Sequence, residues 1–186
     1  MLDNIRPKIR ALVEDFSKSS FETFTYTTSA IFTIAQENIT ITKVLKNGIE
    51  LGSGEYDFDE DTNKIEIVVA LSSGDIIEVD YTYYKYSDSE LNEYVKASLV
   101  WLSIESYCSV KDYEVEDDDI YPTPDNKTLD LIAIISSILI KPSYSEYRLP
   151  NLTVRYPESL SKEDKIQKLI RRFNSSIGIT DVLEWD

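Results

Sequence analysis

The chain has 186 residues, no histidine and one cysteine, and its 34 acidic and 19 basic side chains give a formal net charge of −15. This acidity excludes tight, sequence-independent binding of nucleic acid, because the chain repels phosphate backbones. The missing histidine removes the commonest general base and metal ligand, and the lone Cys108 excludes a disulfide within the chain and a Cys-His nucleophile. Composition therefore favours a non-enzymatic protein that has no catalytic residues and binds no cofactor or metal.

The first 20 residues predict one amphipathic helix, over 3–16. Ile5, Ile9 and Leu12 recur at helical spacing, with charged side chains between them. Pro7 is tolerated only in a first turn, so the helix should begin close to the start of the chain.

Residues 21–86 predict about six antiparallel strands, because runs rich in Thr, Tyr, Ile and Val alternate with turn residues. Asn47-Gly48 is typical of a type I′ hairpin turn, in which both central residues need positive φ. In the strand before that turn, Ile39, Ile41 and Lys43 should share one face. This pattern favours a small β-sandwich or barrel-like module.

Two apolar helices are predicted after the strands. The first should begin at a capping box, Ser87 to Glu90, and run to about Tyr107. Leu129 to Ile140 is apolar nearly all round, which predicts a buried helix, although its β-branched content leaves a strand as the alternative. Residues 109–127, which connect these two helices, are predicted to form an acidic loop.

A last helix is predicted over 162–174, capped by Ser161, with a basic outer face. That face and the acidic cluster at 116–119 are either solvated surfaces or the two sides of a contact between identical subunits. The candidate subunit-interface residues are Lys165, Lys168, Arg171, Arg172, Glu116, Asp117, Asp118 and Asp119. In the tail that follows, Trp185 should dock either on the chain's own core or on a neighbour.

These elements together predict an α+β fold. A helical core of about four helices, over 1–20 and 87–173, carries an inserted antiparallel β domain over 21–86. Residues 174–186 form an extended C-terminal tail.

Two further functions are disfavoured. The acids at 57–61 have the spacing of a calcium loop, but Thr62 and Val68 stand where that loop needs glycine and glutamate. No apolar stretch reaches the roughly 20 residues of a membrane-spanning helix. We therefore expect no metal site, no membrane contact and synthesis in a reducing cytoplasm.

The β segment has a motif order found in structural proteins of tailed bacteriophages. It reads Val44-Leu45-Lys46-Asn47-Gly48, Tyr56-Asp57-Phe58, Ile65-Glu66-Ile67, Gly74-Asp75-Ile76 and Val79-Asp80-Tyr81. With the helix over 3–16 before it and the helix beginning at Ser87 after it, the chain resembles the head-to-tail connector (adaptor, or neck) proteins of these phages.

The resemblance implies a structural virion protein, made in the host cytoplasm and located in the neck between capsid and tail. It would form a homo-oligomeric ring of about twelve copies below the portal protein, extend the DNA channel and join the tail or another neck protein. The acidic channel wall would let genomic DNA pass without specific binding. The C-terminal tail would contact the portal through Ile179, Val182, Leu183 and Trp185.

Two alternatives remain open at this point. The 13 tyrosines suit a carbohydrate- or surface-binding β module of a phage tail or host-recognition protein, because their rings could stack on sugars. An enzyme would have to rely on carboxylates, as glycoside hydrolases do.

Overall fold

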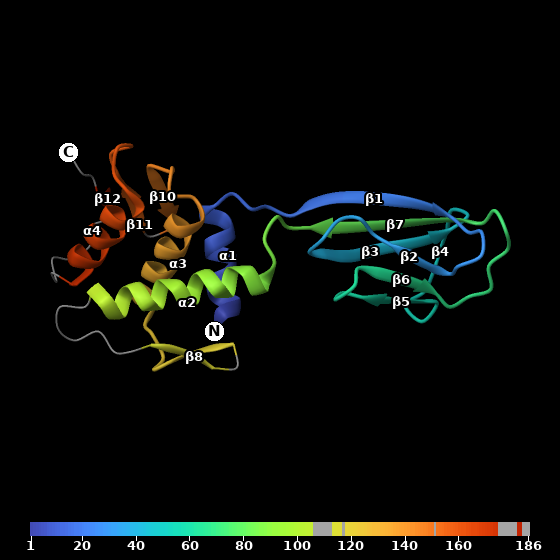
Figure 1. The fold of residues 1–186 in the computed structure, drawn as a ribbon, viewed down its shortest axis with the longest axis horizontal. Helices are drawn as coiled ribbons and strands as arrows, with labels where there is room; N and C mark the ends of the chain where they lie inside the picture. Colours follow the sequence, from blue (N-terminus) through green and yellow to red (C-terminus); the bar gives the residue numbers. More distant parts are fainter. Residues whose placement is uncertain (106–112, 117, 151, 175–181, 184–186) are drawn as a thin grey trace. The chain divides into compact units, whose positions relative to one another are not determined.

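The computed structural model describes residues 1–105, 113–116, 118–150, 152–174 and 182–183. Within them the fold is α+β, with four helices and several small, mostly antiparallel sheets (Figure 1), which confirms the predicted class. The chain divides into a helical unit, Met1–Asp15 with Asp88–Asp186, and a β unit, Phe16–Ser87. Residues 16–20 were expected in the helical part; they belong to the β unit because its first strand already begins at Lys18.

The helical unit is built around its third helix. The four helices are α1 (Leu2–Leu12), α2 (Asp88–Glu105), α3 (Asn126–Ile140) and α4 (Lys162–Asn174). Helix α3 contacts each of the other three, and nine of its residues are buried. The Ser136 and Ser137 hydroxyls donate to the carbonyls of Ile132 and Ala133, at 2.9 and 2.7 Å, so these two polar side chains are satisfied within the buried helix. The prediction of a buried helix here, and not a strand, is confirmed.

Side-chain caps fix the first residues of two helices. Asp125 accepts a hydrogen bond from the Thr128 amide at 2.7 Å, and Ser161 accepts one from the Asp164 amide at 3.1 Å. Each satisfies an amide that has no partner within its own helix. The predicted cap at Ser161 is therefore confirmed.

Two small sheets complete the helical unit. Strands β8 (Glu114–Glu116) and β9 (Asp119–Tyr121) form a hairpin, and β10 (Glu146–Leu149), β11 (Leu152–Arg155) and β12 (Val182–Leu183) form a three-stranded sheet. The prediction of a loop throughout 109–127 was wrong for this hairpin. Its acids alternate with Val115 and the fully buried Ile120, which face each other across the pair, so the hairpin gains a core contact.

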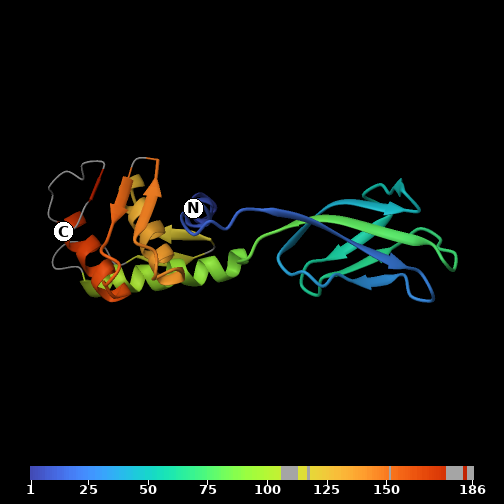
Figure 2. The same ribbon diagram turned by 90° about the horizontal axis from the view of Figure 1, so that it is seen from above.

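The β unit consists of two antiparallel sheets that share one hydrophobic core (Figures 1 and 2). The first has the order β1 (Lys18–Thr25), β7 (Ile76–Tyr83), β3 (Ile39–Lys46), β4 (Ile49–Glu50), and the second has the order β2 (Ile31–Thr33), β6 (Lys64–Ile67), β5 (Tyr56–Asp59). Alternate residues of β7 point inward: Ile77, Val79 and Tyr81 are buried. This alternation is typical of a strand that has one face in a core.

The expected face of β3 is wrong at one position. The pairing of β3 with β7 shifts between Ile41 and Lys43, which marks a β-bulge. Because the extra residue reverses the alternation, Lys43 lies opposite Asp80, and Val44, fully buried, takes the inward place opposite Val79.

A polar lock joins two turns of the β unit. Asn47 and Gly48 have φ of 51° and 79°, as the predicted hairpin turn requires. The Asn47 side-chain amide donates to the Asp75 carboxylate, which also accepts from the Ser72 amide, both at 2.8 Å. The Ile76 amide in turn donates to the Asn47 side-chain oxygen at 2.8 Å. The turn at Asn47 is thereby tied to the turn at Asp75.

This lock should loosen in acid. The Ser72 amide, Asn47 and Lys46 hold the pKa of Asp75 at about 2, below its ordinary value of 3.8. As the pH falls, the Asp75 carboxylate is therefore protonated in the unfolded chain before it is protonated in the folded one. The stabilisation is present above pH 3.8 and is lost as the pH falls toward 2. We expect amide exchange protection at Ser72 and Ile76, corrected for intrinsic rates, to fall across this window.

The matched variant is Asp75→Asn, which should exchange faster at neutral pH and show no further loss across that window. Glu60→Gln, in another exposed loop of the same unit, should behave like the wild type. Equal protection of wild type and Asp75→Asn at both ends of the window would contradict the lock.

Candidate interaction surfaces

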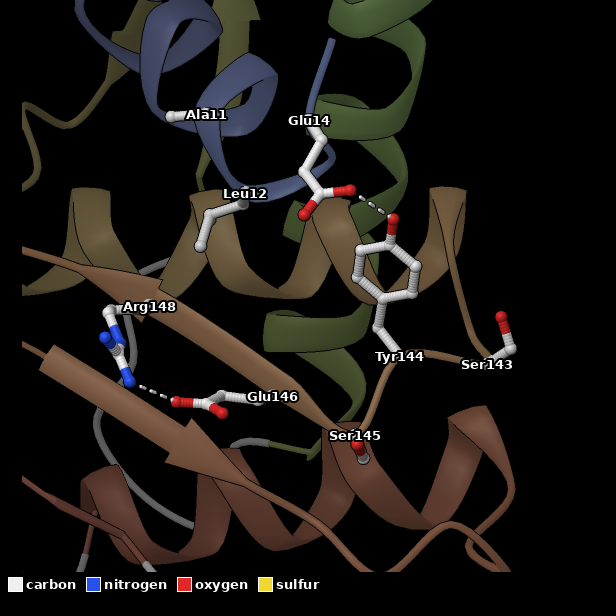
Figure 3. Close-up of a pocket in the computed structure, with 8 residues that line it drawn as sticks. All are labelled: Ala11, Leu12, Glu14, Ser143, Tyr144, Ser145, Glu146 and Arg148. Carbon is white, nitrogen blue, oxygen red and sulfur yellow. Dashed lines mark hydrogen bonds and ion pairs between the residues drawn. The ribbon is translucent and has the colours of Figure 1, made fainter.

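An open groove of about 450 Å³ lies beside the end of α1 in the helical unit (Figure 3). Its lining residues are Ala11, Leu12, Glu14, Ser143, Tyr144, Ser145, Glu146 and Arg148. They come from the C-terminal end of α1 and the residues just after it, and from β10 and the segment that leads into it. The groove is therefore formed by two parts of the chain that are far apart in sequence.

The two carboxylates of this groove are held by different partners. The Tyr144 hydroxyl donates to Glu14 at 2.9 Å and accepts from Lys141 at 2.6 Å, whereas Glu146 pairs with Arg148 at 2.8 Å. Figure 3 shows the two pairs at separate places along the groove. These contacts provide neither a nucleophile held by a base nor two carboxylates that face the same substrate bond. The groove is a polar surface whose charges are already paired.

Lys165 does not belong to the basic outer face of α4, contrary to the prediction. It is 1% exposed, and its ammonium donates to the carbonyls of Pro142 and Tyr144 at 2.6 and 2.9 Å. Burial lowers the pKa of Lys165. The spacing of the lysines along α4 suggested a solvated side chain, but the turn after α3 supplies two carbonyls that satisfy this ammonium inside the unit.

The other basic residues of α4 remain at the surface. Arg171 is exposed, and Lys168 and Arg172 are half-buried. No acidic residue follows Asp164 in this helix, so the charged residues of its last two turns are all basic. This arrangement also places cations at the negative end of the helix dipole.

The acidic hairpin contacts α1 within the same unit. Arg6 pairs with Asp118 at 3.1 Å, and the Met1 nitrogen contacts Asp119. The Asp118 side chain is still 71% exposed, and Glu116 is also exposed. Asp117 lies outside the described residues. Asp118 and Asp119 therefore pair within the chain, while the side chains of Glu116 and Asp118 face solvent.

The predicted tail is described only in part. Val182 and Leu183 form β12 and pair in parallel with Thr153 and Val154 of β11. These two residues are therefore part of a sheet in the helical unit and not of an extended tail. The other two candidate portal contacts, Ile179 and Trp185, lie outside the described residues.

Sequence reasoning missed a pair of arginines on α1. Arg10 bridges Asp15, at 2.5 Å, and Asp88, at 2.9 Å. Arg6 bonds Asn92 at 2.9 Å and also approaches Asp88, at 3.4 Å. Their spacing of four places both on one face of α1, which the sequence did show. Their partners are far along the chain, so no local pattern revealed the network.

Sequence reasoning also missed an apolar stripe on α2. Val100 and Ile104 are 56% and 68% exposed, one helical turn apart. A groove of about 130 Å³ beside them is lined by Lys96, Leu99, Val100, Ser103, Tyr113, Glu114 and Val115. Exposed apolar side chains that border a groove are typical of a surface that contacts another molecule.

Comparison with known proteins adds no relative: neither the protein-family models nor the curated proteins contain a match to this chain. Within the described ranges, no three His, Cys, Asp or Glu side chains gather in a way that could hold a metal ion. Nor does any helix described there have the length and apolar character needed to cross a membrane.

Proposed function

We propose that this chain is a structural virion protein of a tailed bacteriophage, the head-to-tail adaptor of its neck. About twelve copies would form a ring below the portal, extend the DNA channel and join the tail. The proposal rests first on one observation: a β unit with its own core is inserted between α1 and α2 of a helical unit. The resemblance of the sequence to connector proteins rests on this same order, in which a β segment stands between helices.

The charge of the chain supports the same role. A ring with a net charge of −15 per copy repels the phosphates of DNA that passes through it. The DNA would then move through the channel without specific contacts. A protein that gripped DNA would need the opposite balance of charges.

The portal contact is proposed for the C-terminal segment, residues 174–186. Its apolar residues Ile179, Val182, Leu183 and Trp185 would be the anchors, since aromatic and aliphatic side chains dominate the binding energy of interfaces. Of these, Val182 and Leu183 already form a strand beside β11. The portal would therefore meet a segment partly held in the sheet of the helical unit.

The test is the position of the protein in particles. Phage particles whose genome encodes this chain should bind an antibody against the β unit at the junction of head and tail, as seen by electron microscopy. Label on the tail tip or fibres would favour the second candidate below. Particles that carry no label and no peptide of this chain by mass spectrometry would contradict a virion role.

The second candidate is a β unit that binds carbohydrates or a host surface. Phe21 favours it: this ring is 63% exposed on the outward side of β1, where it could stack on a sugar. Four tyrosines of the β unit do not support it, because Tyr26, Tyr56, Tyr81 and Tyr83 pack in or against its core. Binding to a glycan array that is lost in Phe21→Ser would favour this candidate, and no signal would exclude it.

A further inference from the structure

Strand β1 forms a long open edge of the first sheet in the β unit. Among the described strands it pairs with β7 alone and stands at the end of the strand order (Figure 1). Its eight residues contain no proline and pair with β7 without a register shift, and six of them are exposed. Such an edge presents unpaired backbone amides and carbonyls, to which a further strand can bind.

The other edges of these two sheets are short or interrupted. Strands β4, β2 and β5 have two, three and four residues. Beside β4, the outer side of β3 contains the bulge between Ile41 and Lys43. Short strands and bulges are features with which proteins protect a sheet edge from further pairing. Strand β1 has neither, so it is the edge of the β unit that is best suited to receive another strand.

The hydrogen bonds around β7 show which groups of β1 face the open edge. The Tyr26 amide donates to the Asp75 carbonyl at 2.8 Å and continues the β1–β7 register by one residue, so the even-numbered residues of β1 bond to β7. On the other side of β7, the Asn47 amide donates to the Ile76 carbonyl at 2.8 Å. The odd-numbered residues of β1 therefore point their amides and carbonyls away from β7. These residues are Ser19, Phe21, Thr23 and Thr25.

The side chains of β1 suit pairing with a second copy of the same strand. Phe21, in the middle of the strand, is 63% exposed. Glu22 accepts hydrogen bonds from the Ala35 amide and the Tyr81 hydroxyl, at 3.0 Å each, and both donors are uncharged. Lys18 is exposed and makes no ion pair with another residue in the described ranges. The strand thus offers an apolar centre, a cation and a carboxylate whose charge is not neutralised.

We propose that β1 of one copy pairs antiparallel with β1 of a second copy, so that their two sheets join into one continuous sheet. The two-fold axis lies between the two Phe21 residues, and Ser19 pairs with Thr23 of the second copy. Each of these pairs joins groups that face the open edge, which gives about six backbone hydrogen bonds. The contact is isologous and joins two copies only, so it is separate from any contact that closes the proposed ring.

Charge selects this register over the next one. With the axis at Glu22 instead, the two Glu22 carboxylates would lie directly opposite each other, and like charges in that position are destabilising. With the axis at Phe21, Glu22 lies opposite Ser20 of the second copy. Lys18 then lies opposite Phe24 and diagonal to Glu22, within reach of a long side chain. The two exposed Phe21 rings form an aromatic pair on the outward side of the joined sheet.

The first experiment measures association of the full chain by native mass spectrometry and light scattering over a range of concentrations. Phe21→Lys should pair at least about tenfold more weakly than the wild type, because two ammonium groups would lie opposite each other at the axis. Since Phe21 is exposed, the variant should keep the circular dichroism spectrum of the wild type. An equal mixture of Phe21→Lys and Phe21→Glu should pair again, because opposite charges then meet.

Val68→Lys is the matched control for Phe21→Lys. Val68 lies in the same unit but outside its strands, and its exposed fraction of 64% is close to that of Phe21. The same change of charge at this position should leave association as it is in the wild type.

The second experiment tests the register by a disulfide between copies. In a chain whose sole cysteine is removed by Cys108→Ser, Phe21→Cys places two thiols at the axis. The Cα atoms of such a pair are about 5.5 Å apart, which a disulfide can span. Mild oxidation should therefore link the copies covalently. Thr25→Cys lies on the same edge but more than about 20 Å from its counterpart in this register, so it should not be linked.

Three results would overturn this contact. They are a wild type that stays monomeric throughout, association that Phe21→Lys leaves unchanged, and equal linking of Phe21→Cys and Thr25→Cys. None of them bears on the adaptor function, which is tested by label at the neck of particles. Conversely, particles without label would remove the adaptor function and leave the pairing of β1 standing.

Discussion

Replacing Arg10 with alanine should destabilise the helical unit by about 3–5 kcal/mol, because it removes the arginine that pairs with a buried carboxylate. The side chain of Asp15 is only 4% exposed and lies 2.5 Å from the Arg10 guanidinium. The same guanidinium also holds Asp88 at 2.9 Å. Urea unfolding of the full chain, followed by the helical signal in circular dichroism, measures the change.

Two further variants isolate the cause. Lys8→Ala breaks another ion pair of α1, with Asp130 at 2.5 Å, but both side chains are partly exposed, at 32% and 21%, so its cost should stay below about 1 kcal/mol. Removing Asp15 together with Arg10 should restore part of the stability lost in Arg10→Ala, because the buried carboxylate is then removed along with its arginine. A loss within about 1 kcal/mol in Arg10→Ala would show that Asp15 does not depend on this arginine.

The second large effect is expected at Ile132, in the middle of α3. This residue is fully buried, and its helix contacts all three other helices. Ile132→Ala should therefore cost about 2–5 kcal/mol, from lost burial and from the cavity left behind. The same unfolding measurement applies.

Val100→Ala is the matched control for this substitution. It also removes methyl groups from a helix, but Val100 is 56% exposed, so the stability of the monomer should change by no more than about 0.5 kcal/mol. Equal losses at the two positions would mean that α3 is not the centre of the core.

Prediction from the sequence succeeded where neighbouring residues determine the local structure. The continuous apolar run after Leu129 predicted α3, with a strand left as the alternative, because a helix surrounded by others is apolar on every face. Asn47-Gly48 predicted its turn, because few other residues adopt positive φ. In both cases the residues themselves determine the conformation.

Prediction from the sequence failed where contacts with a distant part of the chain determine the position of a residue. Lys165 is buried because carbonyls of Pro142 and Tyr144 reach its ammonium, and nothing in the sequence of α4 reveals them. Lys43 faces outward because a bulge shifts its strand. The β8–β9 hairpin was missed because strands of three residues leave too short an alternation to detect. The candidate surfaces depend in the same way on tertiary contacts.

The bridge made by Arg10 has a consequence for the modularity of this protein. The chain leaves the helical unit just after Asp15 and returns to it at Asp88, and one guanidinium touches both carboxylates. The two ends of the insertion are thus neighbours, which is the geometry that tolerates the exchange of whole domains. A short peptide could replace the entire β unit, or an unrelated module could be grafted at this point, without disturbing the packing of the helices.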